Sequence, residues 1–126
     1  MAVNNPYTKY KEQSVSTATP EELTLMLYNG CIKFMNLAKI FMDEKNLEKV
    51  NINIQKAQDI INELNLTLNM DIEISTNLRQ LYDYVNSRLV DANINKDKVA
   101  LDDAKTIVSE MRDTWKEAIV LARKGK

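Results

Sequence analysis

The stretch 19-TPEELTLMLYNGCIKFMNLAKIFM-42 decides the fold of this chain. Its first residues are typical of a helix start: Thr19 can accept a hydrogen bond at the N-cap, Pro20 suits the first helical position, and Glu22 completes a capping box. Between Leu23 and Met42, 14 of the 20 residues are apolar, whereas a bundle helix needs about three apolar positions in seven. The stretch therefore predicts a long helix that is more apolar than its own share of a core requires.

The rest of the chain repeats a helical spacing of apolar residues. Polar breaks near residues 43–46, 69–71 and 93–97 separate three further predicted helices. Their expected core positions are Val50, Ile54, Ala57, Ile61, Leu64 and Leu68 in the second helix, Ile74, Leu78, Leu81, Val85, Leu89 and Ala92 in the third, and Leu101, Ala104, Val108, Met111, Trp115, Ala118 and Ala122 in the fourth. Because short turns join antiparallel neighbours, the pattern predicts an all-α, antiparallel up-down four-helix bundle.

The leader before this bundle has a composition of its own. Asn5-Pro6 repeats the cap-then-proline signal of Thr19-Pro20, so a short capping helix there would place Tyr7 and Tyr10 on one face. A helix this short is marginal in water unless it leans on something else. We therefore expect residues 1–18 to be a mobile N-terminal lid and residues 19–126 to be a single-domain bundle.

Composition and charge narrow the class of protein. The 126 residues, 44% of them hydrophobic and 28% charged, suggest one domain with a single core. A net charge of −1 gives no long-range field that would recruit nucleic acid, so we expect no nucleic-acid partner. No apolar run approaches the roughly 20 residues that cross a bilayer, so direct membrane insertion is not expected. The absence of a secretory signal and the single cysteine, Cys31, predict a cytoplasmic location.

The sequence also limits the chemistry that the chain can carry out. It contains no histidine, which removes histidine phosphorelay, the Glu-x-x-His pairs of di-iron bundles and any His-activated nucleophile. Cys31 falls on the apolar face of the first helix and is interpreted as a buried structural thiol. We expect no catalytic, cofactor-binding or metal-binding residues, and an enzyme with a carboxylate-bound metal is the remaining alternative of that class.

The apolar residues of the first helix fall into two stripes. The first contains Leu23, Met26, Leu27, Cys31, Phe34, Leu37, Ala38 and Phe41, and is interpreted as a core face. The second contains Leu25, Tyr28, Ile32 and Met35, stepping by three, four and three residues. Two interpretations of the second stripe stay open. Either this helix lies deeper than its neighbours and meets two of them, or the stripe is an exposed groove wall for another chain. On the second interpretation, Tyr7 and Tyr10 cover the groove until a partner displaces them.

Several segments resemble a known family. The block NPYTKYKEQSVSTATPEELTLMLYNGCIKF (residues 5–34) resembles the N-terminal third of the flagellin-specific export chaperones, the FliS family of flagellar type III secretion. EISTNLRQLYDYVNSRLVDAN (73–93) and RDTWKEA (112–118) are similar to its third and fourth bundle helices. The resemblance spans nearly the whole chain in the right order, and the link at NMDIE (69–73) departs from it, because glycines are frequent there in the family.

The resemblance implies a function without catalysis or cofactors. It implies that the chain binds the disordered C-terminal segment of newly made flagellin, prevents premature polymerisation and delivers it to the membrane export gate. By the match, Tyr7 and Tyr10 occupy part of the binding surface until flagellin replaces them. The residues themselves suggest Leu25, Tyr28, Ile32 and Met35 as further partner-binding positions. A self-associating bundle, in which the second stripe closes a homodimer in the absence of a client, is the alternative.

Overall fold

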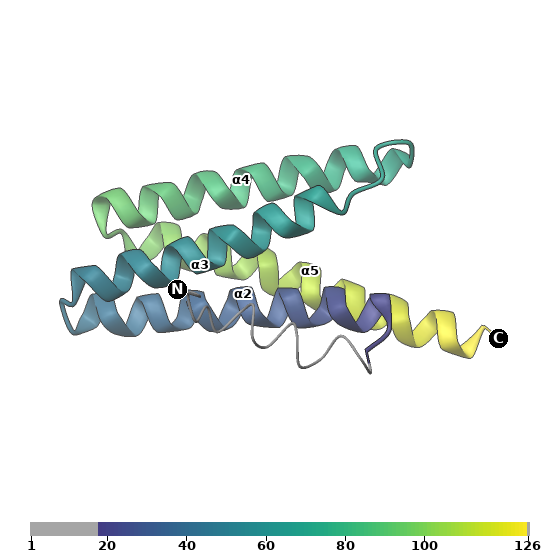
Figure 1. Cartoon of the computed structure of the whole chain (residues 1–126), viewed down its shortest axis with the longest axis horizontal. Coiled ribbons are helices and arrows are strands. Elements are labelled where there is room, and N and C mark those ends of the chain that lie inside the picture. The colour runs from purple at the N-terminus through teal and green to yellow at the C-terminus, as the bar shows by residue number, and fades with distance from the viewer. Residues whose placement is uncertain (1–17, 126) are drawn as a thin grey trace, which may run out of the picture.

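The computed structural model describes residues 18–125, which form an up-down bundle of four helices (Figure 1). The helices are α2 (Pro20–Asp43), α3 (Leu47–Leu66), α4 (Glu73–Asn95) and α5 (Lys98–Lys124). α2 packs against α3 and α5, and α4 packs against the same two helices. The all-α bundle and its three breaks are therefore confirmed. The lid expected at residues 1–18, with Tyr7 and Tyr10, lies outside the described residues apart from Ala18.

Side-chain caps fix the starts of three helices. At α2 the predicted capping box is present, because the Glu22 amide donates to Thr19 Oγ1 over 3.1 Å and the Glu22 carboxylate accepts from the Thr19 amide. At the start of α3 the Asn46 side chain accepts a hydrogen bond from the Lys49 amide, and at the start of α5 the Asp97 side chain accepts one from the Val99 amide. α4 differs, because its N-cap residue is Ile72, which has no side chain that can accept a hydrogen bond. One helix start is thus left without the usual cap.

The packing of α2 on α3 is the closest in the bundle. At Gly30, an added Cβ would lie 3.3 Å from Ile60 Cδ1, so the absence of a side chain lets the two helices approach. Cys31 is fully buried beside this contact, and its thiol donates to the Ala57 carbonyl oxygen at 3.6 Å. The interpretation of Cys31 as a buried structural thiol is therefore confirmed.

Two parts of the predicted core are wrong. In α4, Ile74 and Leu81 are 60% and 40% exposed, whereas Ser75 and Tyr82 are buried. The buried side of the first turns is rotated because α4 diverges there from α5 (Figure 1), and because Tyr82 meets a polar partner inside the bundle. In α5, Ala118 and Ala122 are exposed because this helix runs past the end of its neighbours (Figure 1). Trp115 is only partly buried.

The turn between α2 and α3 stores strain that a substitution can relieve. Lys45 has a φ of 58°, the left-handed region that favours glycine, and the Asn46 amide donates to the Phe41 carbonyl across it. We expect Lys45→Gly to raise the free energy of unfolding by about 1 kcal/mol, because the clash of the side chain with the backbone is removed. Urea unfolding measures the change.

The matched control is Lys105→Gly, which removes the same side chain from the interior of α5. There, glycine is expected to lower stability by about 1 kcal/mol, because it weakens a helix. A loss of stability in both variants would contradict the assignment of strain to Lys45.

Candidate docking surface at the open end of the bundle

The second stripe of α2 is enclosed by the bundle. Tyr28, Ile32 and Met35 are 3%, 8% and 0% exposed, and Leu25 is the one member that stays partly exposed. The interpretation of this stripe as an exposed groove wall is therefore wrong for Tyr28, Ile32 and Met35. The physical reason is the alternative that the sequence left open: α2 packs against α3 on one side and α5 on the other. A homodimer that buries this stripe is wrong for the same reason, because Tyr28, Ile32 and Met35 are already buried within one chain.

Tyr28 is held in place across the bundle by a second tyrosine. Its hydroxyl oxygen lies 2.6 Å from that of Tyr82 on α4, and both side chains are buried. Burial raises the pKa of both phenols, so both stay neutral over the physiological pH range. Tyr28 is the first buried residue of α2, and Tyr82 lies in the first half of α4, so the pair is close to one end of the core.

Beyond this tyrosine pair the bundle opens. Figure 1 shows that the start of α2 and the end of α5 stay together, while the α3–α4 connection lies apart from them. Trp115 Nε1 donates to the Glu21 carbonyl oxygen over 2.9 Å, and Arg123 pairs with Glu22 at 3.7 Å. These contacts fix the first turn of α2 on α5. Because Leu25 follows Glu21 by four residues, it lies on the same side of α2.

Apolar side chains remain accessible at this opening. We define the end surface by six partly or fully exposed residues: Leu23, Leu25, Leu27, Trp115, Ile119 and Leu121. Leu121 alone is 61% exposed. The α3–α4 connection, which lies apart from this surface, carries a second group of exposed residues: Leu66, Met70, Ile72 and Ile74 are 81%, 44%, 52% and 60% exposed. Large exposed apolar side chains that gather at one end of a bundle make that end a candidate interaction site.

The α3–α4 connection carries a signal that the sequence interpretation missed. From Leu66 to Ile74, apolar and polar residues alternate without a break, and the residues between the two helices do not continue a helical pattern. The segment is not an extended strand, because Leu66 ends α3, Glu73 begins α4 and turns lie between them. The uncapped start of α4 lies in the same segment. The exposed apolar side chains and the missing N-cap of α4 indicate that this connection is not optimised for the stability of the folded bundle.

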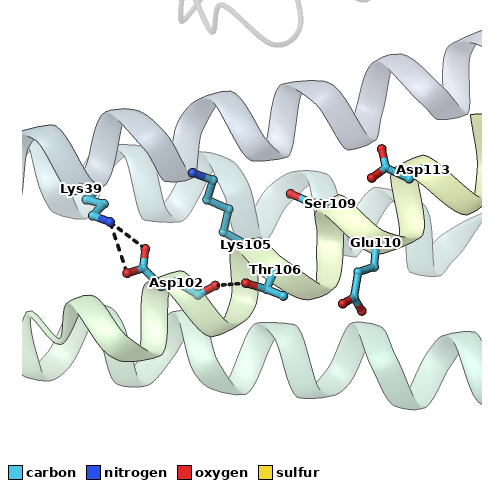
Figure 2. Close-up of a pocket in the computed structure, with 7 residues that line it drawn as sticks. All are labelled: Lys39, Asp102, Lys105, Thr106, Ser109, Glu110 and Asp113. Carbon is cyan, nitrogen blue, oxygen red and sulfur yellow. Dashed lines mark hydrogen bonds and ion pairs between the residues drawn. The ribbon is translucent and has the colours of Figure 1, made fainter.

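A polar groove lies elsewhere, along the face shared by α2 and α5. It is lined by Lys39, Asp102, Lys105, Thr106, Ser109, Glu110 and Asp113, all but the first from α5 (Figure 2). Lys39 Nζ donates to both carboxylate oxygens of Asp102, at 3.0 and 3.2 Å, and closes one end of the groove. Both side chains are about half exposed, so the pair contributes little to stability. Its lining is polar throughout, unlike that of the end surface.

Two further observations concern metals and membranes. Among residues 18–125, no three Cys, Asp or Glu side chains are placed to share a metal ion. Each helix in the same range lacks an apolar run of the length that a bilayer crossing needs.

The fold defines a class: an all-helical, antiparallel up-down four-helix bundle with exposed apolar side chains at one end. The family model described as "Flagellar protein FliS" matches residues 3–122. The chain therefore belongs to the FliS family. The family resemblance of its N-terminal, third and fourth helical blocks is confirmed.

Curated relatives match most of the chain. The chain is 51% identical to the flagellar secretion chaperone FliS of Bacillus subtilis (strain 168), over all of this chain and 95% of that protein. It is 30% identical to the flagellar secretion chaperone FliS of Escherichia coli (strain K12), over 86% of this chain and 82% of that protein. A solved structure described as a crystal structure of a flagellar chaperone from bacteria superposes with a TM-score of 0.74 at 21% identity, over 90% of this chain and 94% of that one. At that identity the structural likeness bears on the fold alone.

The tyrosine pair makes the bundle sensitive to alkaline pH. Because burial raises the pKa of Tyr28 and Tyr82, the folded chain keeps both protons while the unfolded chain loses them near the ordinary value of 10.0. The stabilising contribution is therefore complete below that pH and is lost as the pH rises above it. We expect the free energy of unfolding to fall less steeply for Tyr28→Phe/Tyr82→Phe, by up to about 1.4 kcal/mol per pH unit for each hydroxyl.

Urea unfolding at about pH 8 and about pH 11 measures this difference. At the lower pH the double variant should be close to the parent chain in stability, because both partners of one hydrogen bond are removed together. Parallel pH profiles for the two proteins would contradict the assignment.

Proposed function

We propose that this chain is a flagellar secretion chaperone that binds the disordered C-terminal segment of newly made flagellin. By covering that segment in the cytoplasm, it prevents premature polymerisation and delivers the client to the export gate. It acts by binding, without catalysis, cofactor or metal. Full-length similarity to the flagellar secretion chaperone of Bacillus subtilis is the observation that carries the proposal.

The open end of the bundle supports a polypeptide client. A disordered segment with alternating apolar and polar residues gains burial when it covers the end surface, and it loses conformational entropy in the same step. Complete burial of one leucine contributes about 1.5–3 kcal/mol, and ordering one residue of the client costs about 1–2 kcal/mol. Binding therefore needs several apolar contacts at once. The end surface provides such contacts, and the exposed apolar residues of the α3–α4 connection provide a second set for a client long enough to reach both.

The leader is the second part of the proposal. Tyr7 and Tyr10 belong to 17 residues that join the bundle at Ala18, immediately before the first turn of α2. A chain of that length reaches up to roughly 55–60 Å when extended, so the end surface is well within range. We propose that the two tyrosines compete with the client for this surface. The competition would prevent the apolar end from binding unrelated proteins.

Client binding is tested by calorimetric titration of flagellin and of flagellin lacking its last few dozen residues. We expect a one-to-one complex with the intact protein and no measurable heat with the truncated one. Equal heats from both would contradict the C-terminal model. Trp115 is the one tryptophan of the chain and lies in the end surface, so its fluorescence should change on binding.

The end surface itself is tested by one substitution and a matched control. Leu121→Asp should weaken client binding by at least about tenfold, because a leucine contact is replaced by a charge. Leu121 is exposed, so the bundle should keep its stability. Val99→Asp makes a similar change at the start of α5, where the exposed fraction is 72%. Equal weakening by both variants would place the client elsewhere.

Deletion of residues 1–15 tests the leader. If Tyr7 and Tyr10 together stabilise the covered state by about 2–3 kcal/mol, the deletion should tighten client binding by about 30- to 150-fold. Weaker binding would show instead that the tyrosines contact the client. Sedimentation of the same two proteins over a range of concentrations reports whether either self-associates without client.

A further inference from the structure

A second surface with its own chemistry follows the outer side of the α2–α3 contact. The two helices are antiparallel, and their facing residues keep a constant register: Gly30 meets Ile60, Phe34 meets Lys56, and Phe41 meets Lys49. In each pair the two residue numbers add to 90, so a step along α2 is matched by an equal step back along α3. The two aromatic positions are seven residues apart, roughly 10 Å along the helix axis.

Three lysines lie over the two phenylalanine rings of this surface. Lys33 Nζ and Lys56 Nζ lie 5.9 and 5.4 Å from the centre of the Phe34 ring, and Lys49 Nζ lies 5.1 Å from that of Phe41. An ammonium group within about 6 Å of a ring face is attracted to it. These cation–π contacts keep the three ammonium groups close to the interface between α2 and α3.

These lysines are free to pair with a partner. Lys39, Arg88, Lys98, Arg112 and Arg123 all form ion pairs with carboxylates of the bundle. Among the described residues, Lys33, Lys49 and Lys56 form none. Lys33 and Lys49 are exposed, and Lys56 is partly so. The three ammonium groups are therefore available to a partner, although Glu48 and Asp59 add negative charge to the same turns of α3.

Apolar side chains accompany the lysines at helical spacing. On α2, Ile40 follows Lys33 by seven residues and is 49% exposed; on α3, Ile52 lies between Lys49 and Lys56 and is 39% exposed. Leu37 and Phe41 are partly buried against the core. We call these residues the lysine seam: Lys33, Leu37, Ile40, Phe41, Lys49, Ile52 and Lys56. Its combination of apolar and basic side chains is complementary to an acidic amphipathic helix.

We propose that the lysine seam binds an amphipathic α-helix of a partner protein whose carboxylates are spaced seven residues apart along the edge of its apolar face. Such a helix would lie along α2 and α3, with its apolar side on Ile40 and Ile52. Its carboxylates would face ammonium groups at the Phe34 and Phe41 levels, which are one heptad apart.

The charges on the chain exclude other occupants of the seam. Residues 1–17 contain Lys9, Lys11 and Glu12, a side-chain charge of +1, so the leader does not complement the seam. A nucleic acid would leave the apolar residues uncovered. Glu48 and Asp59 lie next to Ile52 on α3, so the carboxylates of a bound helix have to face the lysines on the side of α2, away from these two acidic residues. An acidic helix satisfies both the apolar and the basic members.

The proposal is tested with three lactam-bridged helical peptides of 18 residues that share one leucine face. The first carries glutamates seven residues apart beside that face, the second carries the same glutamates on the opposite face, and the third has lysines in place of the glutamates. Fluorescence anisotropy of a labelled N-terminus should show that the first binds at least about tenfold more tightly than the other two, because three ion pairs contribute roughly 0.5–1 kcal/mol each. Backbone amide shifts should map its binding to residues 33–41 and 49–56.

Two charge-reversal variants locate the effect. Lys33→Glu/Lys56→Glu should weaken the first peptide by at least about tenfold and favour the lysine peptide instead. Lys105→Glu/Lys116→Glu changes the net charge equally on α5 and should alter binding by less than about twofold. The proposal is overturned if the first two peptides bind equally, if both double variants weaken binding alike, or if the first peptide shows no binding below about 1 mM. The inference does not depend on the flagellin client: titration of the same variants with flagellin, followed through Trp115, reports separately on the proposed function.

Discussion

The burial of α2 on two sides is the constraint on which the rest of the structure depends. One side of the helix meets α3 at the glycine contact, where the two backbones approach closely. The other side meets α5, and Tyr28 extends through the bundle to Tyr82 of α4. A helix with a single apolar stripe could not satisfy both neighbours. The surplus of apolar residues in the sequence is therefore used mainly inside the molecule.

The same constraint explains why the apolar surface of the bundle lies at one end. α2 begins with a complete capping box and is tied to α5 by Trp115, so its first turns stay helical although the core has ended. Figure 1 shows the α3–α4 connection lying apart from that pair. Leucines on α2 and α5 that would fill a longer core are left with partial cover. The opening therefore follows from the unequal lengths of the four helices, and no additional helix or loop is required to form it.

The sequence predicted what local physics decides. The capping box of α2, the three breaks and the periodicity of α3 follow from neighbouring residues, and the structure reproduces them. The burial of Tyr28, Ile32 and Met35 could not be deduced, because a helical wheel shows that a face is apolar and not which helix covers it. The error at Ile74 has the same origin, since its exposure depends on the divergence of α4 from α5.

The candidate site was partly accessible to sequence reasoning. Of its members, Leu25 was selected as a contact, and Trp115 was placed in the core because its spacing suits a helix interior. The position of Trp115 depends on a hydrogen bond to a carbonyl 94 residues earlier, which no local pattern encodes. The alternation from Leu66 to Ile74 was visible in the sequence, but such a pattern is typical of a half-buried strand and would not have predicted exposed turns between two helices. Family resemblance supplied the function but gave no position for these residues.

The two proposed surfaces differ in the interaction that would make each of them selective for its partner. At the end surface, selectivity has to come from length, because several apolar contacts must form before they offset the ordering of a disordered segment. Along the lysine seam it comes from charge, because the ammonium groups over Phe34 and Phe41 are displaced or paired only by a carboxylate in register. A polypeptide that satisfies one requirement gains nothing at the other. A bundle of 126 residues can thus keep apolar surface exposed in two places without binding the same partners at both.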